Sequence, residues 1–417
     1  MAVKNGYKQT EVGEIPEDWS FKPLVELVKS DSPICYGVVQ VGRNVDGGVP
    51  IVAIKYVKEI GCANLHKTEP FLEKPYQRSR VSAGDVLISI KGTIGRVGVV
   101  PEGFNGNISR ELARLRIDST NSPQYVAQQL ESASTQSRIA SATVGTTRLE
   151  FSIATVKSFA IPLPPTKAEQ EAIAEALSDA DALIESLEHL IAKKRQIKQG
   201  AMQQLLTGQK RLPGFTGEWK EVQLRKCLLA NPDYGINAAG VPLERDIPVY
   251  LRITDIDDDG RFIENGRVGV SHPLALDYVL GSDEIVFART GASVGKTYLY
   301  KPEDGVVVFA GFLIRAKVDP KKLSSKFLLF FTQTEQYWDW VRVNSMRSGQ
   351  PGINGNEYAS MELLVPPTVD EQTAIAETLS DMDEEIAALE AKLSKARQLK
   401  QGMMQELLTG KTRLVWG

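Results

Sequence analysis

One passage of this sequence occurs twice, and any fold must accommodate both copies. The stretch LPPTKAEQEAIAEALSDAD runs from Leu163 to Asp181, and VPPTVDEQTAIAETLSDMD runs from Val365 to Asp383. The copies align without a gap from Pro164–Leu212 onto Pro366–Leu414, and about 30 of the 49 aligned pairs are identical. Identity at this level with a fixed offset indicates an internal duplication.

Each copy has the pattern of one long helix. In the first copy, two prolines precede Thr166, and Glu169 follows three residues later. This is a capping-box signature, in which the threonine hydroxyl accepts from the Glu169 amide and the glutamate side chain reaches back to the helix start. Both copies end in LLTG, which places Gly208 and Gly410 as C-terminal caps. Each helix is then about 40 residues and roughly 60 Å long.

An apolar seam runs along each predicted helix, in steps that alternate between four and three residues. This is the 3.5-residue period of a coiled coil, so we expect the two helices to pack against each other, antiparallel, around a pseudo-twofold between the duplicated halves. Basic residues crowd the last turns, where they complement the helix dipole or contact phosphates or a partner. The seam residues are Ile173, Leu177, Ala180, Ile184, Leu187, Ile191, Ile375, Leu379, Met382, Ile386, Leu389 and Leu393.

The two segments that flank the first helix repeat only weakly. Short β-rich runs such as Val86–Ile90 and Ile285–Ala288 alternate with glycine turns, and each segment has one helical stretch, Gln124–Ile139 or Lys326–Trp340. We predict an α+β fold of two globular α/β domains and two long antiparallel coiled-coil helices. The predicted boundaries are 1–162 for the first domain, 163–212 for the central helix, 213–363 for the second domain and 364–417 for the C-terminal helix.

Composition narrows the class of protein. The net charge is −3 and no segment is a basic tail, so bulk charge attraction is not the main device if this chain binds nucleic acid. The three cysteines are widely spaced and the N-terminus is polar, which predicts a cytoplasmic protein without a disulfide framework, signal peptide or membrane span. Only Cys62 and His66 have metal-ligand spacing, and no second pair completes a zinc site, so we expect no metal.

Three motifs approach known sites without matching them. GASVGKT (Gly291–Thr297) has three residues between its glycines where a phosphate-binding loop needs four. In DIDDDGRFIENG (Asp255–Gly266), the twelfth position of a calcium loop is glycine instead of glutamate. NPDY (Asn231–Tyr234) resembles the Asn-Pro-Pro-Tyr loop of amino-methyltransferases, but no methyl-donor signature accompanies it. With no nucleophile and base set either, we expect a non-catalytic binding protein without cofactors.

The doubled PPTKAEQEAIAEAL and PPTVDEQTAIAETL passages, the LLTG helix ends, GDVLISIKGTIGRVG (Gly84–Gly98) and SDEIVFARTGASVGKT (Ser282–Thr297) resemble the specificity subunits of type I restriction–modification systems. The resemblance covers essentially the whole chain. It implies that the two divergent segments are target recognition domains, each reading one half of a split site in double-stranded DNA. It also implies that the two helices space these domains and bind two modification (methyltransferase) subunits, which restriction and translocase subunits join.

Base readout favours arginine, lysine, asparagine and glutamine side chains. By position we predict contacts from the residues that flank the repeated turn, Lys91 and Arg96, matched by Arg289 and Lys296. We expect Trp338 and Trp340 to pack in the core, and Arg110, Arg114 and Arg116 to form the polar face of a strand. A scaffold with two β-rich protein- or glycan-binding domains is the alternative function. Further candidates for DNA contacts are Arg43, Arg78, Arg80, Arg148, Arg252 and Arg347.

Overall fold

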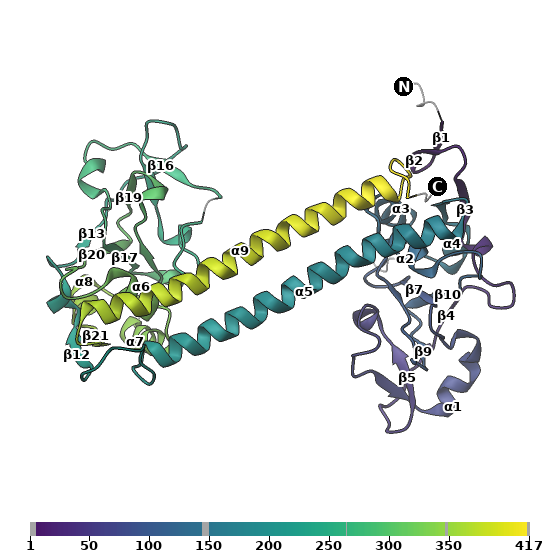
Figure 1. Cartoon of the computed structure of the whole chain (residues 1–417), viewed down its shortest axis with the longest axis horizontal. Helices are drawn as coiled ribbons and strands as arrows, with labels where there is room; N and C mark the ends of the chain where they lie inside the picture. The colour runs from purple at the N-terminus through teal and green to yellow at the C-terminus, as the bar shows by residue number, and fades with distance from the viewer. Residues whose placement is uncertain (1–5, 144–149, 264, 347–348, 415–417) are drawn as a thin grey trace. The chain divides into compact units, whose positions relative to one another are not determined.

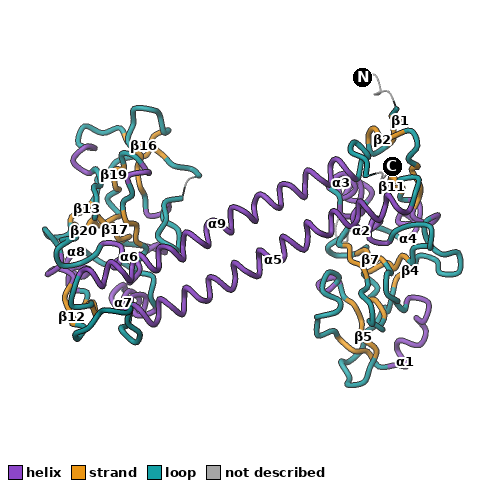
Figure 2. Tube along the Cα trace, in the orientation of Figure 1, coloured by secondary structure: helices purple, strands orange, loops and turns teal. Residues whose placement is uncertain are grey.

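The computed structural model describes residues 6–143, 150–263, 265–346 and 349–414. The chain divides into two compact units (Figure 1). The first unit comprises Met1–Glu188 and Ala391–Gly417, and the second comprises His189–Glu390. Both units contain helices and strands, as Figure 2 shows. No helix of the described residues is long and apolar enough to cross a membrane.

The two long helices are α5 (Lys167–Leu205) and α9 (Val369–Leu407), each 39 residues long, as the duplication predicts. Each ends before a glycine with positive φ, Gly208 at 70° and Gly410 at 71°. A Cβ at Gly208 would lie 3.2 Å from the Trp219 ring, and one at Gly410 would lie 2.5 Å from Pro16. Glycine is therefore required at both ends, for the left-handed conformation and for the close approach of the following chain.

The capping-box prediction is only half right. Thr166 Oγ1 accepts from the Glu169 amide at 3.3 Å, and Thr368 Oγ1 accepts from the Glu371 amide at the same distance. The two glutamate carboxylates, however, accept hydrogen bonds from arginines instead of capping their own helices. Glu169 binds Arg413 within the first unit, and Glu371 binds Arg211 within the second. A guanidinium satisfies a buried carboxylate better than one amide does, because it donates two charge-assisted hydrogen bonds.

The described residues of the first unit form two small sheets, two β-ribbons and four short α-helices in addition to the ends of the long helices. Its central sheet has the order β4-β10-β7-β8, its second sheet the order β6-β5-β9, and β3 pairs with β11. The strands are β1 (Tyr7–Thr10), β2 (Gly13–Pro16), β3 (Ser20–Pro23), β4 (Cys35–Tyr36), β5 (Val49–Val52), β6 (His66–Thr68), β7 (Val86–Ser89), β8 (Val97–Val99), β9 (Asn107–Ile108), β10 (Leu112–Leu115) and β11 (Ala160–Leu163). The helices are α1 (Pro70–Glu73), α2 (Pro123–Glu131), α3 (Ala133–Ala142) and α4 (Ile153–Ser158).

The second unit repeats most of this topology, but β14 is added to its smaller sheet and no counterpart of the β1-β2 ribbon occurs among its described residues. The orders β13-β20-β17-β18 and β14-β16-β15-β19 correspond to the two sheets of the first unit, and β12 pairs with β21 as β3 does with β11. The strands are β12 (Lys220–Gln223), β13 (Asp233–Tyr234), β14 (Gly240–Val241), β15 (Val249–Leu251), β16 (Val268–Val270), β17 (Glu284–Ala288), β18 (Thr297–Leu299), β19 (Val307–Phe309), β20 (Leu313–Lys317) and β21 (Glu362–Val365). The helices are α6 (Ser325–Phe331), α7 (Glu335–Ser345) and α8 (Gly355–Ser360).

The single helical stretch predicted in each domain is wrong, since each is two helices. In the first unit, Ser132 has β-region backbone angles between α2 and α3, and its side chain accepts from the Thr135 amide. In the second unit, Thr334 caps α7 in the same way, accepting from the Tyr337 amide. A cap inside a helical pattern lets the chain change direction without leaving the amides of the next helix unpaired.

The ends of the long helices belong to the cores of the units. Ile173 and Leu177 of α5 and Leu407 of α9 are buried in the main core of the first unit, together with Trp19 and Tyr125. In the second unit, Ile375 and Leu379 of α9 and Leu205 of α5 are buried in the same way, together with Phe327 and Tyr337. Trp338 and Trp340 pack against this second core, as predicted, and the Trp340 ring stacks on Tyr337.

Candidate nucleic-acid interface

The repeated hairpin of each central sheet ends in an exposed turn, between β7 and β8 or between β17 and β18. In the first unit the Ile90 amide donates to the Glu111 carbonyl, and in the second the Arg289 amide donates to the Phe312 carbonyl. The backbone of Lys91 forms an isolated antiparallel β-bridge with Glu150, and that of Thr290 forms one with Gly352. Arg289 is thus the counterpart of Ile90, and the predicted match with Lys91 is wrong, because the second turn is one residue longer.

In the first unit the turn carries two of the predicted cations. The Lys91 ammonium lies 3.3 Å from a Glu150 carboxylate oxygen, with both side chains partly exposed. The Arg96 side chain is exposed, while its amide donates to Ser89 Oγ at 2.8 Å. The backbone contacts fix the turn and leave the Arg96 guanidinium at the surface, where it can contact a phosphate or a base edge.

In the second unit the turn presents an arginine on an aromatic ring. The Arg289 guanidinium lies 4.9 Å from the centroid of the Tyr234 ring. The Tyr234 hydroxyl accepts from the Gly355 amide at 3.1 Å, which holds the ring in place. Lys296, the counterpart of Arg96, instead donates to the Ile256 carbonyl and pairs with Asp258 at 2.8 Å. Of the two predicted cations, Arg289 therefore rests on an aromatic ring, whereas Lys296 pairs with a carboxylate of its own unit.

Sequence reasoning missed the aromatic residues of this surface. Tyr36 on β4 and Tyr234 on β13 occupy equivalent positions beside β10 and β20, with 39% and 41% of each side chain exposed. Arg110 and Phe312, in the loops that precede β10 and β20, are also exposed. The signal was a Tyr-Gly pair in both segments, at Tyr36 and at Tyr234. We use the name hairpin-end surfaces for two sets of residues: Tyr36, Lys91, Arg110 and Glu111 in the first unit, and Tyr234, Arg289, Thr290, Gly311 and Phe312 in the second.

The other predicted DNA contacts have different surroundings. Arg43 and Arg78 are exposed. The Arg80 guanidinium forms a two-pronged pair with the buried Glu73, and Arg252 forms one with Asp255. Both arginines thus hold loops locally and offer less of their guanidinium to a ligand. Arg148 and Arg347 lie outside the described residues.

The expectation that Arg110, Arg114 and Arg116 form the polar face of a strand is wrong. Arg114 is buried and donates to the Pro33 carbonyl at 3.1 Å. Its counterpart Arg315 is also buried and binds Asp233 and Glu284. Arg116 pairs with Asp85 through two hydrogen bonds of 2.8 Å. A buried guanidinium needs hydrogen-bond acceptors from nearby chain segments. These arginines therefore connect strands of the central sheets to the segments beside them.

The basic residues near the helix ends form ion pairs between the long helices. In the first unit Lys400 pairs with Asp181 at 2.6 Å, and in the second unit Lys198 pairs with Asp383 at 2.7 Å. Lys194 pairs with Glu385 in the second unit. Residue numbers rise along α5 as those of their α9 partners fall, so within each unit the helices run antiparallel. Arg397–Glu188 and Arg195–Glu390 repeat the pattern.

The predicted seam residues divide into two groups by environment. The residues nearest the helix N-termini, Ile173, Leu177, Ile375 and Leu379, are buried in the globular cores. Towards the middle of each helix, Leu187, Ile191 and Ile386 are buried, while Ala180, Ile184, Met382, Leu389 and Leu393 are half-buried. The apolar residues of each helix therefore pack into a globular core near the helix N-terminus. Along the middle of the helix, some residues of the same series are buried and others are half-buried.

A family model and several known proteins match this chain. The family model described as type I restriction modification DNA specificity domain matches residues 16–198 and 275–398. The type I restriction enzyme EcoBI specificity subunit of Escherichia coli is 27% identical over 239 residues, which cover 55% of this chain and 48% of that subunit. The chain thus spans about half the length of that relative.

Two further matches span nearly whole chains. The type I restriction enzyme StySPI specificity subunit of Salmonella potsdam is 23% identical over 428 residues, 97% of this chain and 91% of that one. The crystal structure of a type I restriction–modification system S subunit from M. genitalium has a TM-score of 0.62 and 15% identity, and the match covers 98% of both chains. At that identity the structural likeness establishes the fold alone.

Proposed function

Because this chain belongs to the type I restriction modification DNA specificity family, we propose that each of its two units reads one half of a bipartite site in double-stranded DNA. The hairpin-end surfaces are the reading surfaces. The paired helices, packed as a coiled coil, space the units and dock two modification subunits, which restriction and translocase subunits join in the cytoplasm. In this proposal the chain selects the sequence, and the modification subunits carry out the methylation.

One observation carries the proposal: the two units share a scaffold but differ in the side chains at its hairpin ends. Equivalent strands, turns and the Tyr36/Tyr234 pair recur in both units. The matching backbone hydrogen bonds show that Arg289 stands where the first unit has the buried Ile90, and that the exposed Phe312 stands in place of Glu111. Two domains with the same fold and different side chains at the hairpin ends are suited to recognise different base sequences.

The chemistry of these side chains fits base readout. An arginine presents a rigid fork of donors that matches the two acceptors on the major-groove edge of guanine. Arg289 is supported in the second unit by the Tyr234 ring, which restricts its orientation and lowers the entropy lost on binding. In the first unit Arg110 has 54% of its side chain exposed. With a net charge of −3, the chain leaves much of the phosphate attraction to its partners.

The experiment is a genome-wide map of adenine methylation in cells that express the chain with its cognate modification subunit. A motif of two short blocks with a fixed gap is expected. Replacing Arg289 with alanine should relax one block and Arg110→Ala the other, by roughly 1–3 kcal/mol of discrimination each. Lys220→Ala, on a ribbon strand away from the hairpin ends, is the matched control and should leave both blocks unchanged.

Two outcomes would defeat the proposal. A continuous palindrome would remove the assignment of one half-site to each unit. The absence of any methylation, in cells where the complex forms, would favour the alternative of a scaffold with two protein- or glycan-binding domains. If both variants altered the same block, the hairpin ends would not be separate readers.

A further inference from the structure

One position of the hairpin-end surfaces holds side chains of opposite chemistry in the two units. The Ile90 amide donates to the Glu111 carbonyl at 2.8 Å, and the Arg289 amide donates to the Phe312 carbonyl at 3.0 Å. Glu111 and Phe312 are therefore the same point of the shared frame. Both lie at the surface, with 38% of the Glu111 side chain and 55% of Phe312 exposed.

The surroundings of Phe312 combine an arginine with aromatic rings. The register of β17 and β20 places Arg289 opposite Phe312, and Tyr234 pairs with Ile314, two residues after Phe312. Opposite residues, and residues two apart on one strand, share a face of a sheet. Phe312 thus presents an apolar ring on the same face as the Arg289 guanidinium and the Tyr234 ring.

The carboxylate of Glu111 is held in place but keeps acceptor capacity. Ser109 Oγ donates to its Oε2 at 2.9 Å, and Arg110 Nε lies 3.9 Å from its Oε1. An ionised carboxylate has about four lone-pair sites, so these two neighbours leave room for a further donor. The first unit thus presents an oriented acceptor beside an arginine, where the second unit presents a phenyl ring.

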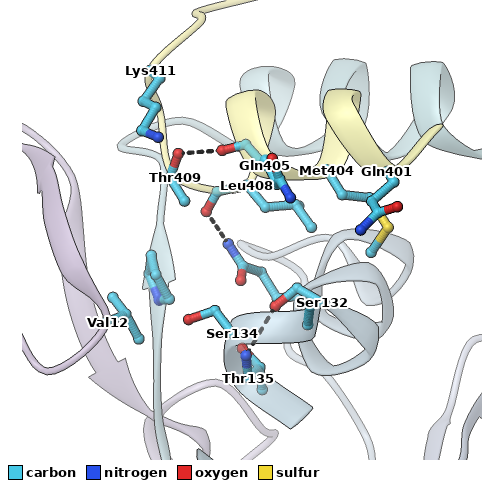
Figure 3. A pocket seen from close by; sticks show the side chains of 13 residues that line it. Val12, Ser132, Ser134, Thr135, Gln401, Met404, Gln405, Leu408, Thr409 and Lys411 are labelled. Atoms are coloured by element: carbon cyan, nitrogen blue, oxygen red, sulfur yellow. Dashed lines mark hydrogen bonds between the residues drawn. The ribbon is translucent and has the colours of Figure 1, made fainter. Parts of the chain in front are cut away.

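The pocket at the end of α9 differs in that its polar groups are used within the chain. It has a volume of about 200 Å³ and lies between α3, Val12 and residues 401–411 (Figure 3). Gln129 Nε2 donates to the Leu408 carbonyl there, and Thr409 Oγ1 donates to the Gln405 carbonyl, both at 2.6 Å. These bonds satisfy carbonyls that a helix end leaves without partners. The pocket therefore serves the helix end, whereas Glu111 and Phe312 face solvent.

The major-groove edges of DNA bases distinguish these two side chains. A carboxylate accepts from the cytosine N4 amino group, but it is repelled by phosphates and by the acceptors of guanine and thymine. Adenine carries an acceptor, N7, directly beside its amino group. A phenyl ring matches only the C5-methyl group of thymine, because on the other edges it would cover polar atoms without bonding them.

We propose that Glu111 accepts a hydrogen bond from a cytosine amino group in the first half-site, and that Phe312 packs on a thymine methyl group in the second. This inference rests on the proposed function and adds the base that each unit selects at one shared position. Cytosine and thymine are both pyrimidines, so the same frame meets either base in the same way. The two half-sites differ at this position because the side chain differs.

The first test maps methylation for single variants expressed with the cognate modification subunit. Glu111→Gln should change one cytosine of the first block to adenine, because a glutamine side chain pairs with adenine N6 and N7. Phe312→Ser should relax one thymine of the second block. Each variant should leave the other block as it is in the wild type.

The second test measures binding of the complex of the full chain and its modification subunit to duplexes of the mapped site, at constant salt. Replacing the thymine that Phe312→Ser relaxes with deoxyuridine removes only its methyl group. Wild-type affinity should fall about fourfold, as expected for one buried methyl group. The Phe312→Ser complex should bind both duplexes equally.

Leu276→Ser and Glu26→Gln are the matched controls, since both side chains are exposed and lie outside the hairpin-end surfaces. Both should reproduce the wild-type map. If the wild type methylates a two-block site but Glu111→Gln and Phe312→Ser keep every base preference, the inference is overturned while the proposed function stands. If the wild type shows no two-block site, the proposed function itself fails.

Discussion

Arg413, which follows helix α9, donates from Nη2 to the Glu169 carboxylate at the start of α5 at 2.8 Å. Arg211, which follows α5, donates from Nε to Glu371 at the start of α9 at the same distance. Each unit thus joins the end of one long helix to the beginning of the other by an arginine and a buried carboxylate. The hydrogen bonds that Arg413 donates to Glu169 are the largest cause that raises the pKa of Arg413 above its usual value, so its guanidinium stays charged.

Removing Arg413 should destabilise the first unit. Arg413→Ala leaves the Glu169 carboxylate, which is 1% exposed, without its partner, and we expect a loss of about 3 kcal/mol in the free energy of unfolding. The double variant Arg413→Ala/Glu169→Gln should recover most of this loss, because no buried charge remains. Chemical denaturation followed by hydrogen exchange at residues 167–177 measures both.

Arg195→Ala provides the comparison, since its side chain is 66% exposed and its pair with Glu390 lies at the surface. Its loss should stay within about 1 kcal/mol. Equal losses for Arg195→Ala and Arg413→Ala would refute the importance of burial at Glu169.

Glu73 gives the first unit a pH-dependent stability. Hydrogen bonds from Arg80, followed by that from Asn107, hold the pKa of this buried carboxyl below its usual value of about 4.3. The native state therefore binds fewer protons than the unfolded state near pH 4. The stabilisation is complete above the unfolded pKa and is lost as the pH falls through the native one.

Replacing Glu73 with glutamine should lower stability at pH 7 by about 1–3 kcal/mol and flatten the profile below about pH 4.3. Urea unfolding between pH 3 and 7 measures the difference, with Glu26→Gln on the exposed surface as the control. A parallel pair of profiles for Glu73→Gln and the wild type would contradict the linkage.

Two glycines, Gly208 just past the end of α5 and Gly200 inside the helix, should respond in opposite ways to alanine. Gly208→Ala forces a side chain into the left-handed region at φ 70° and against the Trp219 ring, which should cost about 1–2 kcal/mol. Gly200→Ala, inside α5 with no atom within 4 Å of the added methyl, should instead stabilise by up to about 1 kcal/mol. Thermal melts of both variants decide, and a stabilised Gly208→Ala would disprove the cap assignment.

The spacing of the two DNA half-sites should follow the lengths of both helices together. Seven residues inserted after Glu188 in α5 and seven after Glu390 in α9 add about 10 Å to each, or about three base pairs of DNA. A methylation map of this double insertion should show the gap enlarged by that amount.

The same insertion in α5 alone lengthens one helix and not the other. The Asp181–Lys400 pair of the first unit and the Lys198–Asp383 pair of the second can then no longer form together. This insertion should lower stability without producing a defined longer gap. An unchanged gap in the double insertion would rule out the helices as the spacer.

The sequence by itself determined the two long helices, because the capping threonines, the apolar period and the terminal glycines are local signals. It also indicated the hairpins whose alternating β-rich runs form β7 and β17. Helix breaks at Ser132 and Thr334 were visible only as ordinary polar residues, since a cap inside a periodic pattern is recognised by the change in backbone direction.

Only the tertiary structure decided the partners of the charges. Arg413 finds Glu169 and Lys400 finds Asp181 across more than two hundred residues, and Arg114 is buried although its pattern resembles an exposed strand face. An ion pair or a burial depends on which surfaces meet in space, and periodicity along a chain carries no information about that meeting.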